Sequence, residues 1–129
     1  MKKFIYLISP NKIEPNFYKN LDSVLASGKI KFFQLRLKNY SLIKLIKISQ
    51  KIKVLTKKYK VNLIINDFPI VAKKIDADGC HLGQSDETIR NTKKLLKKNK
   101  IVGITCHGSK KLVSNAIKSK VDYIAIGSF

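Results

Sequence analysis

Residues 61–83 read VNLIINDFPIVAKKIDADGCHLG and contain two short apolar runs separated by a segment with a helical pattern. Val61–Ile65 and Gly79–Leu82 have the length and apolar character of buried strands. Pro69–Lys74 lies between them and begins with proline, which is favoured in the first turn of a helix. Two strands joined through a helix lie parallel in one sheet. This stretch therefore predicts a β-α-β unit.

The same alternation continues on both sides of this unit. Further strands are expected at Phe4–Ile8, Phe32–Leu37, Ile101–Thr105 and Tyr123–Gly127. Further helices are expected at Asn16–Ser27, Ser41–Tyr59, Glu87–Lys98 and Ser109–Lys118. Six strands alternating with five helices predict an α/β protein with a parallel sheet.

Units of this length suit an incomplete (β/α)8 TIM barrel with about six strands and five helices, although a doubly wound sheet has the same local pattern and remains an alternative. A weak Asp-x4-Gly repeat at Asp78–Gly83 and Asp122–Gly127 indicates equivalent strands, each preceded by a tight turn. Neither GxGxxG nor GxxxxGK[ST] follows a strand, which weakens the nucleotide-binding alternative. No linker divides the chain, so residues 1–129 are predicted to form a single domain.

The formal net charge is +19, from 25 lysines and only 2 arginines against 8 acidic residues. A basic surface attracts nucleic acid, but paired recognition of phosphates and bases favours arginine. A solvated outer face of the helices is therefore the preferred interpretation, and a nucleic-acid-binding protein is the weaker alternative.

No run approaches the roughly 18 apolar residues of a membrane span, and the first apolar run ends at Ser9-Pro10, too early for a signal peptide. We expect a cytoplasmic protein without a membrane or a specific nucleic-acid partner.

Two Cys-His pairs, Cys80-His81 and Cys106-His107, offer a conceivable four-ligand zinc set. Neighbouring residues of a strand point to opposite faces, so the two members of a pair cannot converge on one ion. Buried structural cysteines are the better interpretation, and neither histidine is given a catalytic role.

Polar residues gather at the predicted carboxyl ends of the strands, where parallel α/β proteins place their chemistry. Gln34, Arg36 and Lys38 alternate with Leu35 and Leu37, so an amide and two cations share one face of the second strand. This pattern indicates an anion site. The alternative is an amphipathic edge strand with a solvated basic face.

One carboxylate follows each of the next two strands, Asp67 and Asp86. Taken singly, each has a structural explanation as the cap of the following helix. Side by side at adjacent strand ends, and next to two cations, they suit a Mg²⁺ ion that also contacts a pyrophosphate.

The fifth strand places Gly103 and Thr105 on one face. The glycine is expected to let a ligand approach the backbone, and the threonine offers a hydroxyl group. The alternative is a buried strand with a packing glycine.

Five motifs resemble, in this order, those of thiamine-phosphate synthases: QLRLK (34–38), IINDFPIVA (64–72), ADGCHLGQSD (77–86), GITCH (103–107) and VDYIAIGSF (121–129). The resemblance spans the chain from its first strand to its last. It implies a (β/α)8 barrel transferase of thiamine biosynthesis, which joins hydroxymethylpyrimidine pyrophosphate to thiazole phosphate and releases pyrophosphate.

Carried over position by position, the resemblance implies a role for seven residues. Arg36 and Lys38 would be catalytic, because they stabilise the charge of the leaving pyrophosphate. The residues implied to bind the pyrimidine pyrophosphate are Gln34, Arg36, Lys38, Asn66 and Thr105, and those implied to hold Mg²⁺ are Asp67 and Asp86. Thr105 stands where the family commonly has serine, which keeps the hydroxyl group.

Two departures from the family pattern affect these expectations. The sequence ends at Gly127-Ser128-Phe129, before the two β/α units that hold the thiazole phosphate in the family. We therefore expect a C-terminally truncated member that is inactive and poorly behaved in solution by itself. Ser128 replaces a residue that is commonly proline, which keeps a thiazole tautomerase or a regulatory relative as an alternative. The sequence leaves homo-oligomerisation open.

Overall fold

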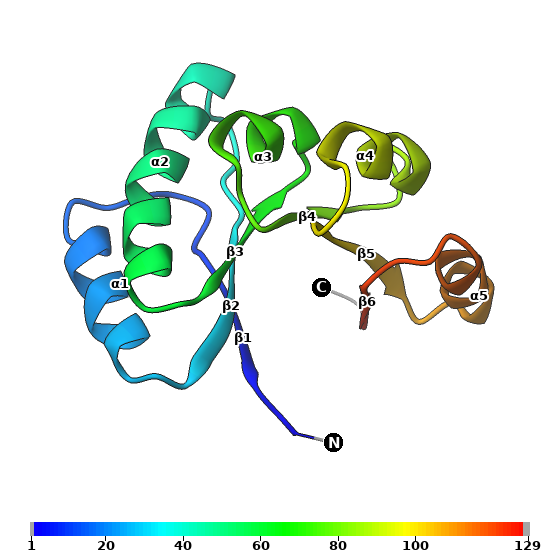
Figure 1. Ribbon diagram of the computed structural model, residues 1–129, viewed down its shortest axis with the longest axis horizontal. Coiled ribbons are helices and arrows are strands. Elements are labelled where there is room, and N and C mark those ends of the chain that lie inside the picture. Colours follow the sequence, from blue (N-terminus) through cyan, green and yellow to red (C-terminus); the bar gives the residue numbers. More distant parts are fainter. Residues whose placement is uncertain (1, 128–129) are drawn as a thin grey trace.

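The computed structural model describes residues 2–127, in which strands and helices alternate from one end to the other (Figure 1). The strands are β1 (Ile5–Ile8), β2 (Ile30–Leu35), β3 (Asn62–Asn66), β4 (Gly79–Leu82), β5 (Ile101–His107) and β6 (Tyr123–Ile126). The helices are α1 (Phe17–Ala26), α2 (Leu42–Lys58), α3 (Pro69–Ile75), α4 (Ile89–Leu96) and α5 (Lys110–Lys118). The predicted alternation is confirmed, with boundaries that shift by at most two residues.

All six strands are parallel and follow one another in the sheet in sequence order, from β1 to β6. The sheet curls, and the helices cover its outer face while β1 and β6 form its two edges (Figure 1). A doubly wound sheet reverses its strand order and carries helices on both faces. The sequential order and the single helical layer therefore exclude that alternative and define part of a β/α barrel.

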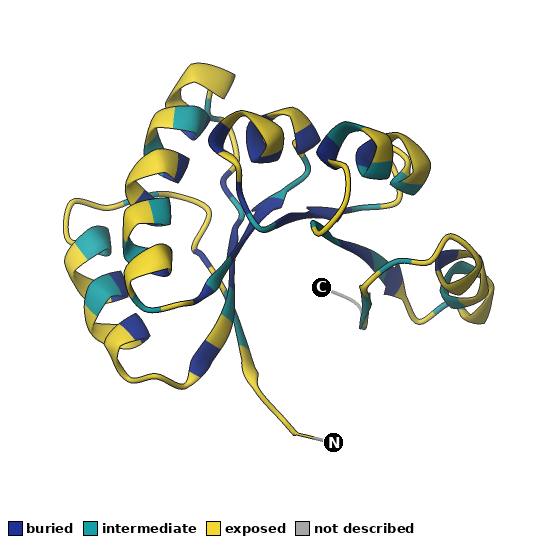
Figure 2. Ribbon diagram, viewed as in Figure 1, coloured by how far each residue is buried: buried dark blue, intermediate teal, exposed yellow. Residues whose placement is uncertain are grey.

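The main core lies between the curled sheet and the helices. Leu63 and Ile65 of β3 face this core together with Ile52 of α2 and Val71 of α3. Ile64 is also fully buried but lies outside that cluster, because alternate residues of a strand point to opposite faces. Figure 2 shows the same division, with buried residues on the sheet and on the inner faces of the helices, and exposed residues outside.

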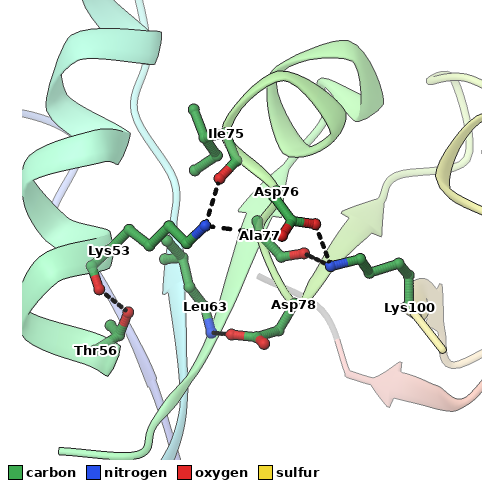
Figure 3. Close-up of polar contacts among 8 residues, drawn as sticks. All are labelled: Lys53, Thr56, Leu63, Ile75, Asp76, Ala77, Asp78 and Lys100. Carbon is green, nitrogen blue, oxygen red and sulfur yellow. Dashed lines mark hydrogen bonds and ion pairs between the residues drawn. The ribbon is translucent and has the colours of Figure 1, made fainter. Parts of the chain in front are cut away.

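The Asp-x4-Gly repeat marks a backbone clamp at the amino-terminal ends of two strands. The Asp78 carboxylate accepts a hydrogen bond of 2.7 Å from the Leu63 N–H (Figure 3). The Asp78 N–H donates to the Leu63 carbonyl at 3.0 Å. Asp122 makes the same pair of bonds with Val102, at 2.8 Å each. The repeated aspartates therefore fix the register between one strand and the next.

We expect Asp78→Ala to destabilise the fold by about 1.5–3 kcal/mol, because it leaves the N–H of the fully buried Leu63 without its charged acceptor. Urea denaturation would measure the loss. Asp76→Ala is the matched control, since Asp76 lies in the same turn but its exposed carboxylate pairs with Lys53 and Lys100 at the surface (Figure 3). Equal losses in the two variants would contradict the clamp.

The two edge strands carry exposed apolar side chains. Ile5 and Ile8 of β1 are 47% and 51% exposed, and Ile126 of β6 is 62% exposed. Exposed apolar edges favour pairing with another chain. We expect residues 1–129 to self-associate in light-scattering measurements and Ile5→Lys with Ile126→Lys to reduce the association. An unchanged state of association in that variant would place the contact elsewhere.

Among the described residues, no helix has both the length and the apolar character needed to cross a membrane.

Candidate functional site

Gln34, Arg36 and Lys38 lie at and beyond the carboxyl end of β2. Gln34 is buried, and its side-chain amide donates to the Tyr6 hydroxyl at 2.9 Å. The strand ends at Leu35, two residues earlier than predicted, because the Arg36 N–H donates to the Ser9 hydroxyl at 2.8 Å and so leaves the ladder. Arg36 and Lys38 therefore extend from a loop rather than from the strand.

Arg36 is held at this end of the sheet through the loop that follows β1. One of its guanidinium nitrogens, Nη1, donates to the Asn11 side-chain oxygen at 3.1 Å. The Lys38 N–H donates to the Asn11 carbonyl at 3.3 Å, and the Lys38 side chain is exposed. The predicted basic group is thus anchored by backbone and amide contacts.

Asp67 follows β3 directly and has a left-handed backbone with φ 68°. Its N–H donates to the His81 carbonyl at 2.9 Å, which ties the β3 loop to the neighbouring strand. Phe68, not Asp67, is the cap residue of α3, and no side-chain bond is formed there. The alternative interpretation of Asp67 as a helix cap is therefore wrong.

Asp86 lies in the loop after β4. Its carboxylate accepts a hydrogen bond of 2.6 Å from the Gly83 N–H. The cap of α4 is Thr88, whose hydroxyl accepts from the Asn91 N–H, so α4 begins two residues later than predicted. The capping interpretation is wrong for Asp86 as well, and neither carboxylate is used to begin a helix.

The Asp86 carboxylate and the two cations act on the Asp67 carboxylate. Burial and then the neighbouring Asp86 carboxylate raise the pKa of Asp67 to about 6. The positive charges of Arg36 and Lys38 act in the opposite direction and lower that pKa. The structure therefore brings together the polar ends of three adjacent strands, as expected from their parallel order.

The donor set fits a hard divalent cation. Two close carboxylates repel each other, and a cation between them relieves that repulsion. Within residues 2–127, no group of three or more His, Cys, Asp or Glu side chains is placed to hold a metal. A cation here would thus take its other ligands from substrate oxygens and water, which is the usual arrangement of Mg²⁺.

A polar and aromatic network that the sequence analysis missed lines the concave face of the sheet. His81 contacts the Tyr123 hydroxyl through Nδ1 at 2.8 Å and the Thr105 hydroxyl through Nε2 at 2.7 Å. The Tyr123 hydroxyl also contacts that of Tyr6 at 2.5 Å. The Tyr123 ring stacks on His81, with centroids 5.5 Å apart. The network joins side chains from the two edge strands and reaches the predicted site residue Thr105.

Gly103 serves this network rather than a ligand. A Cβ atom at this position would lie 2.0 Å from Cζ of Tyr123. The expectation that Gly103 lets a ligand approach the backbone is therefore wrong, because the Tyr123 ring fills the space, and the alternative of a packing glycine is confirmed. Asn66, the remaining predicted site residue, lies half-buried at the end of β3 in register with His81.

Cys80 and His81 face opposite sides of β4, as predicted. Cys80 is a free, fully buried cysteine in the core between sheet and helices. His81 instead contacts Tyr123 and Thr105 on the concave side. The two side chains of this pair therefore do not converge.

Burial lowers the pKa of the His81 imidazole to about 4. We expect NMR titration to show a neutral ring at pH 5. Because the pKa is lower in the folded state than its ordinary value of 6.5, the unfolded chain takes up the proton first as the pH falls. The contribution of this residue to stability should therefore decrease between about pH 6.5 and pH 4. A ring that titrates near pH 6.5 in the folded protein would contradict the burial argument.

The fold and the site together define a β/α-barrel protein that gathers cations and carboxylates at the carboxyl ends of adjacent strands. A family model described as thiamine monophosphate synthase matches residues 5–129. The chain belongs to this family.

Curated relatives agree with this assignment. The thiamine-phosphate synthase of Pelagibacter ubique is 54% identical over 129 residues, covering 99% of this chain and 62% of the relative. That of Clostridioides difficile is 38% identical and covers 96% of this chain and 59% of the relative. The chain thus spans about three-fifths of the length of the curated relatives it matches.

A solved structure has the same fold. The thiamine phosphate pyrophosphorylase from Pyrococcus furiosus superposes with a TM-score of 0.85 at 28% identity, covering 97% of this chain and 60% of that one. The predicted TIM-barrel type of α/β fold is confirmed by this match together with the sequential parallel sheet.

Proposed function

We propose that this chain carries the pyrimidine-pyrophosphate part of a thiamine-phosphate synthase site. The full-length protein would be a transferase that joins hydroxymethylpyrimidine pyrophosphate to thiazole phosphate and releases pyrophosphate. The observation that carries the proposal is that Asp86, Arg36 and Lys38, at the ends of adjacent strands, all act on the Asp67 carboxylate. Family membership and the names of the relatives support the same activity.

The pyrophosphate would bind next to Arg36 and Lys38. Arg36 is positioned by Asn11, so its charge is already oriented before substrate arrives. Asp67 and Asp86 would hold Mg²⁺, which supplies neutralising charge to the pyrophosphate when bound. Asn66, at the end of the strand between these groups, would hydrogen-bond the same ligand.

The pyrimidine ring would lie against the concave network. Tyr123 and His81 offer flat rings, while Gln34 and Thr105 offer polar atoms. As the bond to the leaving pyrophosphate breaks, positive charge develops on the pyrimidine and negative charge on the pyrophosphate. A neutral His81 adds no positive charge that would oppose this step, and the cations at Arg36 and Lys38 favour it. The thiazole nitrogen then attacks, so the protein needs no nucleophile of its own.

The test is to assay a chimera of residues 1–129 completed with the part of the Pelagibacter ubique relative outside the match. We expect Mg²⁺-dependent formation of thiamine phosphate from the two phosphorylated substrates. Failure of a well-folded chimera to form it would overturn the proposal. Isomerisation of the thiazole without coupling would instead assign the tautomerase activity.

A further inference from the structure

A basic groove lies between α4 and α5, on the helical side of the sheet. Its cavity has a volume of about 530 Å³ and is lined by Arg90, Lys93, Lys94 and Ser119. α4 packs against α3, but no comparable packing joins α4 to α5 within the described residues. The two helices stand apart in Figure 1. The residues that line the groove come from α4 and from the residue after α5. None of its lining residues belongs to the candidate active site.

The positive charge of the groove is not neutralised by the protein. Arg90, Lys93 and Lys94 share one face of α4, because residues three and four apart are neighbours on a helix. In the part of the chain that the structure describes, none of the three forms an ion pair. Glu87, the acidic residue nearest in sequence, is already bonded to the Thr88 N–H and the Asn91 amide.

The end of α5 offsets only part of this charge. The Lys93 ammonium donates to the Lys120 carbonyl, just beyond α5. The carbonyl end of a helix carries about half a negative charge, so one lysine is enough to match it. Arg90 and Lys94 are left to act on a ligand. Ser119 is exposed, but its hydroxyl already donates to the Asn115 carbonyl at 3.0 Å.

The position of arginine is a second, independent indication. The chain contains 25 lysines and only 2 arginines, Arg36 and Arg90. Arg36 lies in the candidate active site, where a pyrophosphate is proposed, and Arg90 lines this groove. A guanidinium group binds phosphate through two parallel hydrogen bonds, which an ammonium group cannot do. A chain that otherwise uses lysine thus places its other arginine in the lining of this groove.

We propose that the α4–α5 groove is a second anion site, which binds a compact ligand carrying two or more phosphate groups. The volume lies within the range of about 300–1,000 Å³ that is usual for small-molecule sites. Arg90 would bind one phosphate group, and Lys94 would contact the next. The site is distinct from the strand-end site and goes beyond the proposed synthase activity.

The test is calorimetric titration with inorganic tripolyphosphate, without divalent ions, at about 0.15 M salt. All variants carry Ile5→Lys with Ile126→Lys, which should limit self-association. The groove variant is Arg90→Gln with Lys94→Gln, which removes two charges but keeps good helix formers. The matched control is Lys44→Gln with Lys47→Gln, an equal charge change on the exposed face of α2. A third variant, Arg36→Gln with Lys38→Gln, reports on the strand-end site. Circular dichroism would verify that each variant is folded.

We expect saturable binding that weakens at least about tenfold in the groove variant and less than about twofold in the α2 control. The strand-end variant should lose only binding at the candidate active site and keep the groove-dependent binding. Arg90→Lys should also weaken binding several-fold, since it keeps the charge and removes the paired donors. Equal weakening in the groove variant and in the α2 control would show that the attraction is diffuse. Loss of all binding in the strand-end variant would assign the ligand to the candidate active site. Absence of saturable binding, or groove-dependent binding of single-stranded oligonucleotide alone, would also overturn the proposal.

Discussion

Replacing Asp86 by asparagine in the completed chimera should lower thiamine phosphate formation by on the order of 100-fold or more. The amide keeps the shape of the side chain and still offers an oxygen to the Gly83 N–H. The substitution removes the negative charge that the proposed metal requires. The neighbouring Asp67, which has a raised pKa of about 6, is then the one carboxylate left of the pair. Steady-state kinetics across a range of Mg²⁺ concentrations would measure the loss. The thermal unfolding midpoint should change little, since Asp86 does not cap α4.

Glu87→Gln is the matched control for this prediction. Glu87 is the neighbouring carboxylate, but it bonds to Thr88 and Asn91 rather than facing Asp67. It should leave activity within about twofold. Gly83→Ala is a second probe, because a Cβ there would lie 2.8 Å from the Asp86 carboxylate and displace it without removing its charge. If Asp86→Asn retained full activity and unchanged Mg²⁺ dependence, Asp67 and Asp86 would have no role in metal binding.

Gly103→Ala should destabilise the protein by about 1–3 kcal/mol and disrupt the concave network. The added Cβ would overlap the Tyr123 ring, at 2.0 Å from Cζ, on a strand that is buried and cannot move aside. The ring would have to leave its contacts with Tyr6 and His81. Denaturant unfolding would measure the stability, and the NMR signals of the His81 ring would report the change of contacts.

A double variant separates overlap from other effects of the substitution. Tyr123→Ala removes the ring, so adding Gly103→Ala to it should cost little further stability. Gly108→Ala is the control, because a Cβ at Gly108 meets nothing within 4 Å. An additive loss in the double variant would mean that Tyr123 does not occupy the space above Gly103 as the structure has it.

The fold could be predicted from the sequence because each β/α unit shows its own local pattern. The predicted boundaries of β2 and α4 were wrong because other groups in the structure compete for the hydrogen bonds there. The alternation of polar and apolar residues continues through Leu37, so the sequence predicts that β2 does too. In the structure the Arg36 N–H donates to the Ser9 hydroxyl instead, and the strand ends before it. α4 begins at Ile89 because Thr88 supplies the cap and Asp86 bonds backward to Gly83. These hydrogen bonds depend on individual side chains, which the periodicity of apolar residues does not take into account.

The candidate site was predictable where it follows strand ends and hidden where it crosses the sheet. Asp67 and Asp86 follow consecutive strands, so parallel order alone brings them together. Tyr6 and Tyr123 lie 117 positions apart, and only the curl of the sheet joins their hydroxyls. A tyrosine in each edge strand was the available signal. Nothing local to either residue points to the other.

The sequential strand order also bears on how the protein is made. Each strand pairs with the one synthesised just before it, so every new β/α unit can dock on a surface that already exists as the chain leaves the ribosome. Ordering only the short connection between neighbours keeps the entropy cost of each step small. The Tyr6 and Tyr123 contact is the exception, because it cannot form until β6 has been translated. The growing sheet is therefore built by local steps, and the contact between β1 and β6 across the concave face forms only after the strands between them.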